Sequence, residues 1–384
     1  MSASTVTLIM MIGAIILLVF SMGVTPYVMR KNLHFGVMLP DRASELPEVK
    51  QWKQTFLRWS IGLGVGGSLF LLTGLFMNLD EEALTRYFMW IGLMIIGVIA
   101  IIQVILYSSF HNKARILKAE RFSVAEIKAD ARVMVSTGFR HEKLIVSNGW
   151  LVVMGSLIIL VTALLPVIFY HQIPDVIPVN WGTSTATAFR PRSRALFLLV
   201  PAIQLGLLII FLFVNYSFKA TKQLLRPKNA KASLAQNRAY RYALSKMMVV
   251  VGIGTLLMTC GLQITMMLGL DEFPPFMIWF AIFHSAFAII SIIYIGFKYG
   301  QGGERYNAAQ TTHNNEAHHH MTDDDVYWKW GIIYDNPHDP AIFVEKRFGI
   351  GITLNLARWQ SWVMLFGVLA FIVIITFVSF RMVR

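Results

Sequence analysis

The chain has 384 residues, of which 56% are hydrophobic and only 14% are charged. Soluble domains usually carry about a quarter charged residues, so this composition excludes an ordinary soluble protein and indicates a membrane protein. The single cysteine, Cys260, excludes an intrachain disulfide.

Eight stretches are long and apolar enough to cross a bilayer, which takes roughly 20 predominantly apolar residues. They lie at approximately 5–27, 59–78, 87–109, 148–170, 195–217, 247–269, 277–297 and 360–380. The first stretch has neither a basic region before it nor a small-residue cleavage site, so we expect a retained span rather than a signal peptide. The predicted fold class is an all-α polytopic bundle of about eight transmembrane helices.

The basic residues alternate from loop to loop. Of the 34 Lys and Arg residues, 28 lie in the segments after spans one, three, five and seven. Because positive charge accumulates on the cytoplasmic side, this pattern predicts that both termini lie outside. The net charge of +13 is then explained by topology and by attraction to anionic lipid. We therefore expect the lipid bilayer, and not nucleic acid, as a partner.

Several patterns in the first half of the chain predict helix packing and surface helices. Before span two, apolar residues at helical spacing predict a short amphipathic helix: Leu46, Val49, Trp52 and Phe56. Within span two, Gly62 and Gly66 have the GxxxG spacing that allows close helix contact. After span three, Ser123 and Glu126 form a capping-box pattern at the start of a predicted basic surface helix.

The predicted outside loop at 171–194 contains the candidate outer site. Pro174 and Pro178 exclude a continuous helix and favour extended backbone. Together with Asn180 and Trp181 they form the predicted ligand-binding residues of this loop. Three arginines could meet an acidic partner or lipid head groups, although flanking a span is the simpler role. They are Arg190, Arg192 and Arg194.

Few polar side chains lie inside the spans. Gln204, Gln263 and His284 are further candidate ligand-binding residues, and His284 is the only ionisable group well inside a span. His284 is explained either by a hydrogen bond between helices or by a ligand or proton site. We expect Met266 and Met267 to pack against lipid.

No enzyme signature is intact, so we expect no enzyme activity, no catalytic residues and no cofactor. The sequence HEKLI at 141–145 begins like a zinc-protease HExxH motif, but Ile145 replaces the second histidine. A cluster of histidines and acids is expected to bind metal only adventitiously, because consecutive side chains rarely all face one ion; no metal site is predicted. Its members are His318, His319, His320, Asp323, Asp324 and Asp325.

Residues 322–359 are predicted to form a cytoplasmic cap between spans seven and eight, after a flexible linker at 298–321. A unit of about 36 residues is too small for a strong core of its own, so it should dock on the membrane surface or on other cytoplasmic loops. The cap is either an interfacial anchor for span eight or a docking and sensing element. The docking candidates are Trp328, Trp330, Asp335, Asn336 and Asp339, and the turn chemistry predicts Asx turns at Asp335 and Asn336.

Three stretches resemble known families. The sequence DDDVYWKWGIIYDNPHDPAIFVEKRFGIGITLNLA closely resembles the small C-terminal domain of unknown function 5808, including its Asn-Pro-x-Asp and V-x-K-R-x-G-x-G patterns. IPDVIPVNWG resembles domain of unknown function 1648, found in SdpI-type bacteriocin-immunity membrane proteins, although that pattern often has His where this chain has Asn180. TPYVMRKNLHFGVMLPD is similar to the N-terminal part of longer Gram-positive members. The resemblance implies a bacterial plasma-membrane protein of a Gram-positive organism.

Together these patterns predict a non-enzymatic membrane protein that binds a secreted peptide, an envelope component or another membrane protein through its outside loops, as in immunity or envelope sensing. The alternative is a transporter or permease for a small or amphipathic molecule, with a polar cavity around Gln204, Gln263 and His284. The predicted segments are 1–147 with three spans, 148–217 with spans four and five, 218–297 with spans six and seven, 298–321 as linker, 322–359 as cap, and 360–384 with span eight.

Overall fold

The computed structural model describes residues 2–122, 142–181, 185–222, 230–306 and 324–383. This part of the chain is mostly helical, and eight of its helices are long and apolar enough to cross a membrane. The predicted fold class is thereby confirmed. The predicted capping box at Ser123 and Glu126 and most of the predicted linker lie outside the described residues. The same holds for the cluster of histidines and acids except Asp324 and Asp325.

The chain divides into two compact units. Unit one comprises Met1–Thr137, Lys222–Asn237 and Gly296–Ala357, and unit two comprises Gly138–Thr221, Arg238–Ile295 and Arg358–Arg384. Each unit therefore combines segments that are far apart in the sequence.

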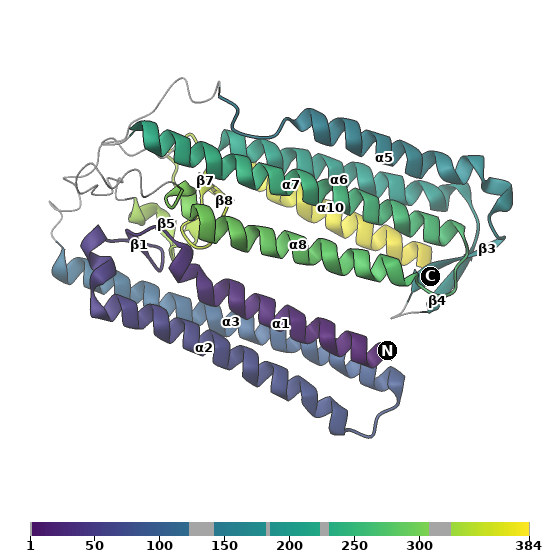
Figure 1. Ribbon diagram of the computed structural model, residues 1–384, viewed down its shortest axis with the longest axis horizontal. Helices are drawn as coiled ribbons and strands as arrows, with labels where there is room; N and C mark the ends of the chain where they lie inside the picture. The colour runs from purple at the N-terminus through teal and green to yellow at the C-terminus, as the bar shows by residue number, and fades with distance from the viewer. Residues whose placement is uncertain (1, 123–141, 182–184, 223–229, 307–323, 384) are drawn as a thin grey trace. The chain divides into compact units, whose positions relative to one another are not determined.

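Three helices form the frame of unit one and run side by side (Figure 1). They are α1 (Ala3–Val28), α2 (Pro47–Leu72) and α3 (Glu81–Arg121). Their N-termini are capped where the sequence allows it: Ser2 accepts from the backbone of Thr5, and Asp80 accepts from Ala83 N at 2.7 Å. The predicted amphipathic helix is confirmed, but it is the first part of α2, with Val49 and Phe56 fully buried.

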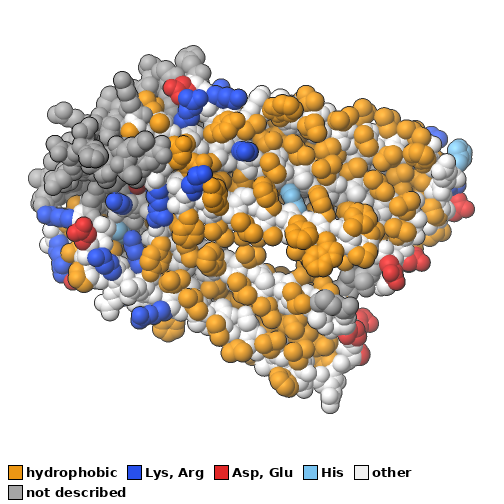
Figure 2. Space-filling view, in the orientation of Figure 1, with side chains coloured by type: hydrophobic (Ala, Val, Ile, Leu, Met, Phe, Trp, Pro, Cys, Tyr) orange, Lys and Arg blue, Asp and Glu red, His pale blue; other side chains and the backbone are white. Residues whose placement is uncertain are grey.

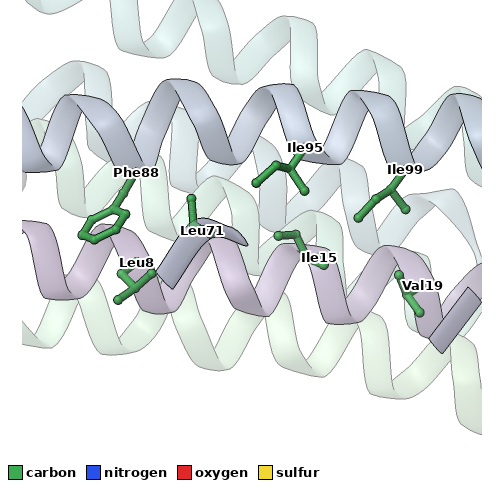
Figure 3. Packing of buried hydrophobic residues seen from close by; sticks show 7 residues of the cluster. All are labelled: Leu8, Ile15, Val19, Leu71, Phe88, Ile95 and Ile99. Atoms are coloured by element: carbon green, nitrogen blue, oxygen red, sulfur yellow. The ribbon is translucent and has the colours of Figure 1, made fainter. Parts of the chain in front are cut away.

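The three helices are held together by interlocking aliphatic side chains. Figure 3 shows this cluster, which consists of Leu8, Ile15, Val19, Leu71, Phe88, Ile95 and Ile99. The close approach uses glycines other than the predicted pair: a Cβ on Gly64 or Gly67 would meet side chains of α1 or α3, whereas a Cβ on Gly62 or Gly66 would meet nothing within 4 Å. The GxxxG prediction was therefore wrong, because the helix turns the Gly62 and Gly66 face away from its neighbours.

The described part of unit one also contains three small antiparallel hairpins, which the sequence pattern did not predict. Their strands are β1 (Leu33–His34) with β2 (Val37–Met38), β5 (Trp328–Lys329) with β6 (Ile333–Tyr334), and β7 (Phe343–Glu345) with β8 (Ile352–Leu354). Short 3₁₀ turns accompany them at Asp41–Glu45, Gln301–Gly303 and Asp325–Tyr327, and a further one, Thr73–Phe76, follows α2. The last two hairpins belong to the predicted cap, which is thus a folded element.

Unit two is built around five further helices (Figure 1). They are α5 (Asn148–Ile168), α6 (Arg194–Ala220), α7 (Ala230–Met267), α8 (Pro275–Tyr299) and α10 (Trp359–Val383), with the first residues of α7 and the last of α8 belonging to unit one. A 3₁₀ turn (Tyr170–Gln172) leads into a hairpin of β3 (Val176–Trp181) and β4 (Ala186–Pro191). The two prolines thus favour extended backbone as predicted.

The helices of unit two expose apolar side chains, as a protein solvated by lipid requires. Hydrophobic side chains cover the face of this unit seen in Figure 2. Along α10, Phe366 is 60% exposed and Ile374 is 59% exposed. Glycine allows the close contacts inside: a Cβ on Gly155 would lie 2.7 Å from Leu208, and one on Gly206 would collide with the Phe371 ring. Exposed apolar faces and a glycine-rich interior are typical of membrane helix bundles.

Candidate functional site

The β3–β4 hairpin is fixed to the chain that follows α7. Its strands pair from Val176 opposite Pro191 to Trp181 opposite Ala186, with register irregularities on both sides of Asn180. Trp181 Nε1 donates to the carbonyl oxygen of Leu270 at 3.1 Å, and its ring packs edge-on against Phe273. The hairpin is therefore an anchored element.

Below the hairpin lies a small apolar core, and this is where Met266 and Met267 belong. Both are buried, at 6% and 9% exposure, and they pack in a cluster with Ile177 of β3 and Phe197 of α6. The expectation that these methionines face lipid was wrong, because the hairpin folds over the helix ends and covers them.

The predicted outer residues do not all point the same way. Pro178 is buried, Pro174 packs against Gly269, and Trp181 is used as the anchor. Pro174 and Asn180 keep exposed side chains, and the hairpin also exposes the large apolar side chains of Phe189 (46%) and Val176 (55%). The exposed surface of the hairpin thus includes Phe189, which is not among the predicted site residues.

Arg192 has a structural role. Its guanidinium donates to the carbonyl oxygens of Tyr170, at 3.0 Å, and Ile173, and pairs with Asp175 at 2.9 Å. It also lies over the Tyr170 ring, as does Arg194. These contacts satisfy carbonyl groups in the turn that follows α5, so the Arg192 guanidinium already has partners within the chain.

Gln204 and Gln263 meet at the same threonine inside unit two. Gln204 Nε2 lies 3.1 Å from Thr162 Oγ1, and Gln263 Nε2 donates to the Thr162 carbonyl oxygen at 3.1 Å. Both side chains are fully buried. The amide oxygen of each has no hydrogen-bond partner among the described residues, which costs free energy in an apolar interior.

His284 on α8 joins the same network through threonines of α7. Its Nε2 lies 3.1 Å from Thr255 Oγ1, while Thr259 Oγ1 lies within hydrogen-bond distance of the Thr255 carbonyl and of Gln204 Nε2. The imidazole also packs on Gly254, where a Cβ would approach it to 2.5 Å. The three intramembrane residues singled out in the sequence therefore form one polar network across α5, α6, α7 and α8.

The cap has a polar core centred on Asn355. Its Oδ1 accepts from Asn336 N at 3.0 Å, and its Nδ2 lies 2.9 Å from the Asn336 carbonyl and 3.2 Å from the Asp339 carbonyl. Tyr334 adds a second bridge, donating its hydroxyl to Asp339 Oδ2 at 2.8 Å and accepting from Asn336 Nδ2 at 3.0 Å. The predicted Asx turn forms at Asn336, whose Oδ1 accepts from His338 N, whereas the carboxylate of Asp335 pairs with Lys329.

Arg347 fastens the cap to the rest of unit one. Its side chain is only 5% exposed, pairs with Asp324 and Asp325, and donates to the Gly36 carbonyl at 2.8 Å. Asp325 also binds Lys118 on α3, at 2.5 Å. One guanidinium thus links two acids of the cap to the loop between α1 and α2.

A second buried group of charges holds β7. Arg30, at the end of α1, pairs with Glu345 of β7 and lies 3.5 Å from Glu304. Asn237 Nδ2 donates to the other Glu345 oxygen at 3.0 Å, and Lys222 binds Asp339 at 2.6 Å. Arg30, Lys222 and Asn237 therefore bind the cap from other parts of unit one, as expected for a unit that docks on other loops.

Two turns, each an aromatic residue followed by glycine, meet where the loop between α1 and α2 contacts the cap. Phe35 (φ 48°) and Gly36 (φ 80°) join β1 to β2, and Trp330 (φ 52°) and Gly331 (φ 67°) lie between β5 and β6. A Cβ on Gly36 would lie 2.6 Å from Gly331 Cα and 2.5 Å from the Tyr107 hydroxyl. The two turns touch backbone to backbone, which only glycine permits at both positions.

Burial and charge at this contact shift the pKa values of nearby groups. Burial alone would raise the pKa of Asp325, but Arg347 and Lys118 together lower it below its usual range. Burial, with a smaller contribution from Tyr334 hydrogen-bonding to Asp339, raises the pKa of the Tyr334 hydroxyl. Burial and then the nearby Lys53 charge lower the pKa of His34 to about 3, so its ring is neutral.

Arg347, Glu345, Arg30 and Asn355 are not among the predicted site residues. The signal that could have found the first two is charge next to an apolar strand pattern, since Glu345 directly follows Phe343 and Val344, and Arg347 lies two residues further on. Arg30 and Asn355 carry no comparable local signal, because their partners are distant in sequence.

The fold and these sites define a multi-pass membrane protein whose eight candidate spans are joined to a folded cap. Two family models match parts of it. Residues 157–205, which cover the end of α5, the β3–β4 hairpin and the start of α6, match the Domain of unknown function (DUF1648). Residues 337–362, which cover the second half of the cap and the start of α10, match the Family of unknown function (DUF5808). No curated protein and no solved structure matches the chain.

Proposed function

We propose that this is a non-enzymatic protein of a bacterial plasma membrane, from a Gram-positive organism, that binds a secreted peptide or an envelope component through its outer hairpin. The observation that carries the proposal is the anchored β3–β4 hairpin, which leaves Phe189, Val176 and Asn180 exposed. The charge pattern supports a position of this hairpin on the outside of the membrane.

The chemistry of the hairpin suits an extended peptide. A hairpin of only two strands offers backbone donors and acceptors for a further strand, and exposed aromatic side chains add apolar contact. The resemblance to the immunity-protein domain favours a bacteriocin-like peptide as the ligand. Arg192 and Trp181 then contribute without contacting the ligand, because their hydrogen bonds fix the conformation of the hairpin before binding.

The test is protection of a deletion strain against a broad panel of secreted antimicrobial peptides. Wild-type protein should restore resistance to at least one peptide, and Phe189→Ala should lose most of it while reaching the membrane in normal amounts. Trp90→Ala is the matched control, because Trp90 is an exposed aromatic on α3, 63% exposed and far from the hairpin in sequence. An unchanged sensitivity of the deletion strain across the panel would remove the immunity version of the proposal.

A second candidate function is transport of a small or amphipathic molecule, and the polar network favours it. Gln204, Gln263 and His284 lie in one network, and two buried amide oxygens there have no partner among the described residues. A solute with hydrogen-bond donors could satisfy those oxygens during passage.

Matched glutamine substitutions distinguish transport from simple helix packing. Gln204→Leu should abolish export or uptake of any solute whose accumulation depends on the protein. Gln103→Leu, at a fully buried glutamine of unit one, should leave that accumulation unchanged. Equal transport by wild type and the Gln204 variant would assign the network to helix packing alone.

A further inference from the structure

Trp330 is an exposed indole on a backbone that such residues seldom adopt. Its φ of 52° lies in the left-handed region, and its side chain is 64% exposed. Trp328, two residues earlier, is 6% exposed and lies under Arg347, whose guanidinium carbon is 5.0 Å from the ring centre. The turn therefore keeps one indole inside the cap and leaves the other outside it.

Gly331, the residue after Trp330, shows which part of α3 this turn lies against. A Cβ on Gly331 would lie 3.0 Å from both the Tyr107 hydroxyl and His111 Nδ1. On α3 the apolar run begins after Arg86 and ends at Tyr107. At about 1.5 Å per residue this run is about 30 Å long, which is the thickness of the hydrocarbon core. Tyr107 and His111 thus mark the boundary between lipid chains and head groups.

We propose that Trp330 is a membrane-interface anchor that places one indole of the cap among the lipid head groups at the end of the α3 span. Tryptophan favours this region because its ring is largely apolar and its N–H can bond to head groups or water. The strained turn is compensated by the glycine contact and by Arg347, which hold the hairpin against α3. The occupant of this exposed surface is the bilayer itself.

Val326 provides a contrast within the same cap. It is also apolar, and at 90% it is even more exposed. Its neighbour Asp325, however, binds Lys118, seven residues beyond His111 on α3. That is about 10 Å further from the hydrocarbon at the rise of an α-helix. Val326 should therefore lie in water, so exposure and apolar character alone do not explain the proposed role of Trp330.

The proposal is tested with a fluorescent label at each position in turn. In a Cys260→Ser background, Trp330→Cys and Val326→Cys are labelled with bimane, and the protein is reconstituted in nanodiscs of phosphatidylcholine with or without bromine on the lipid chains. Brominated lipid should quench the label at 330 several-fold more than the label at 326, and aqueous iodide should show the reverse order.

Two outcomes would overturn the proposal. Strong iodide quenching at 330 with no effect of brominated lipid would place the residue in water. Protection of the 330 label from both quenchers would mean that protein covers it, either unit two or a second copy of the chain.

Native fluorescence provides a second measurement if the cysteine variant does not fold. Trp330→Phe should reduce the part of the tryptophan emission that brominated lipid quenches, whereas Trp328→Phe should not, because Trp328 is buried. Equal lipid quenching in wild type and the Trp330→Phe variant would refute the assignment.

Discussion

Replacing Gly36 with alanine should open the contact between the cap and the loop that joins α1 to α2. The new Cβ would lie 2.5 Å from the Tyr107 hydroxyl, 2.6 Å from Gly331 Cα and 2.9 Å from the Gly331 carbonyl oxygen. Two of these three atoms belong to backbone, so a rotamer change cannot relieve the clash. The methyl group must therefore separate the two turns.

The cost of this change has two parts. The left-handed backbone, at φ 80°, costs an alanine about 1–2 kcal/mol. Forcing a methyl group into a filled space costs about 1–3 kcal/mol more. Gly349 is the control that separates the backbone cost from the steric cost, because its φ is 84° and nothing lies within 4 Å of its Cβ position. Gly349→Ala should incur only the backbone cost.

Hydrogen exchange of the cap amides measures the difference. With the protein in nanodiscs, the amides of 328–334 should exchange faster in the Gly36→Ala variant than in the Gly349→Ala variant. A contact cost of about 1–3 kcal/mol corresponds to about a 5- to 150-fold change in the opening equilibrium. Equal protection in the two variants would refute the argument that the two turns lock the cap to the loop.

Further predictions concern the charges of the cap and its polar core. Arg347→Met should destabilise the cap by about 3 kcal/mol, because Asp324 loses its cation and Asp325 keeps only Lys118. Proteolysis of the cap measures this loss, and the exposed Arg115→Met is the control. Acid should destabilise unit one. Because the pKa of His34 in the folded protein is about 3, the free energy of unfolding should fall as the pH drops from about 6.5 toward 3. The lowered pKa of Asp325 should add a further loss of stability below about pH 4. The apparent Tm measured against pH should show both losses, and His34→Phe should remove the loss at the higher pH. If His34→Phe leaves the pH dependence of the Tm unchanged, the loss does not come from His34. Asn355→Leu should destabilise the cap by several kcal/mol, since it leaves buried backbone groups without partners at about 1–3 kcal/mol each; wild-type exchange rates near Asn336 would contradict this.

Local pattern predicted much of the fold. A run of about 20 apolar residues has few alternatives to a transmembrane helix, because every backbone polar group must be satisfied inside the segment. Extended backbone at Pro174 and Pro178 and the Asx turn at Asn336 depend on near neighbours, and both were predicted. Helix lengths were harder to predict: α3 continues to Arg121, because helix propensity does not end where the membrane ends.

What the sequence determined by itself is the class of this protein: a multi-pass membrane protein with a separate, turn-rich segment before its last span. Only the tertiary structure decided which groups meet. Arg30 and Glu345 are 315 residues apart, and Gly36 and Gly331 likewise come from opposite ends of the chain. A buried charge or a left-handed glycine is stable only when a particular partner is present, and no local pattern identifies that partner. The structure likewise decided which of two neighbouring indoles, Trp328 and Trp330, lies inside the cap.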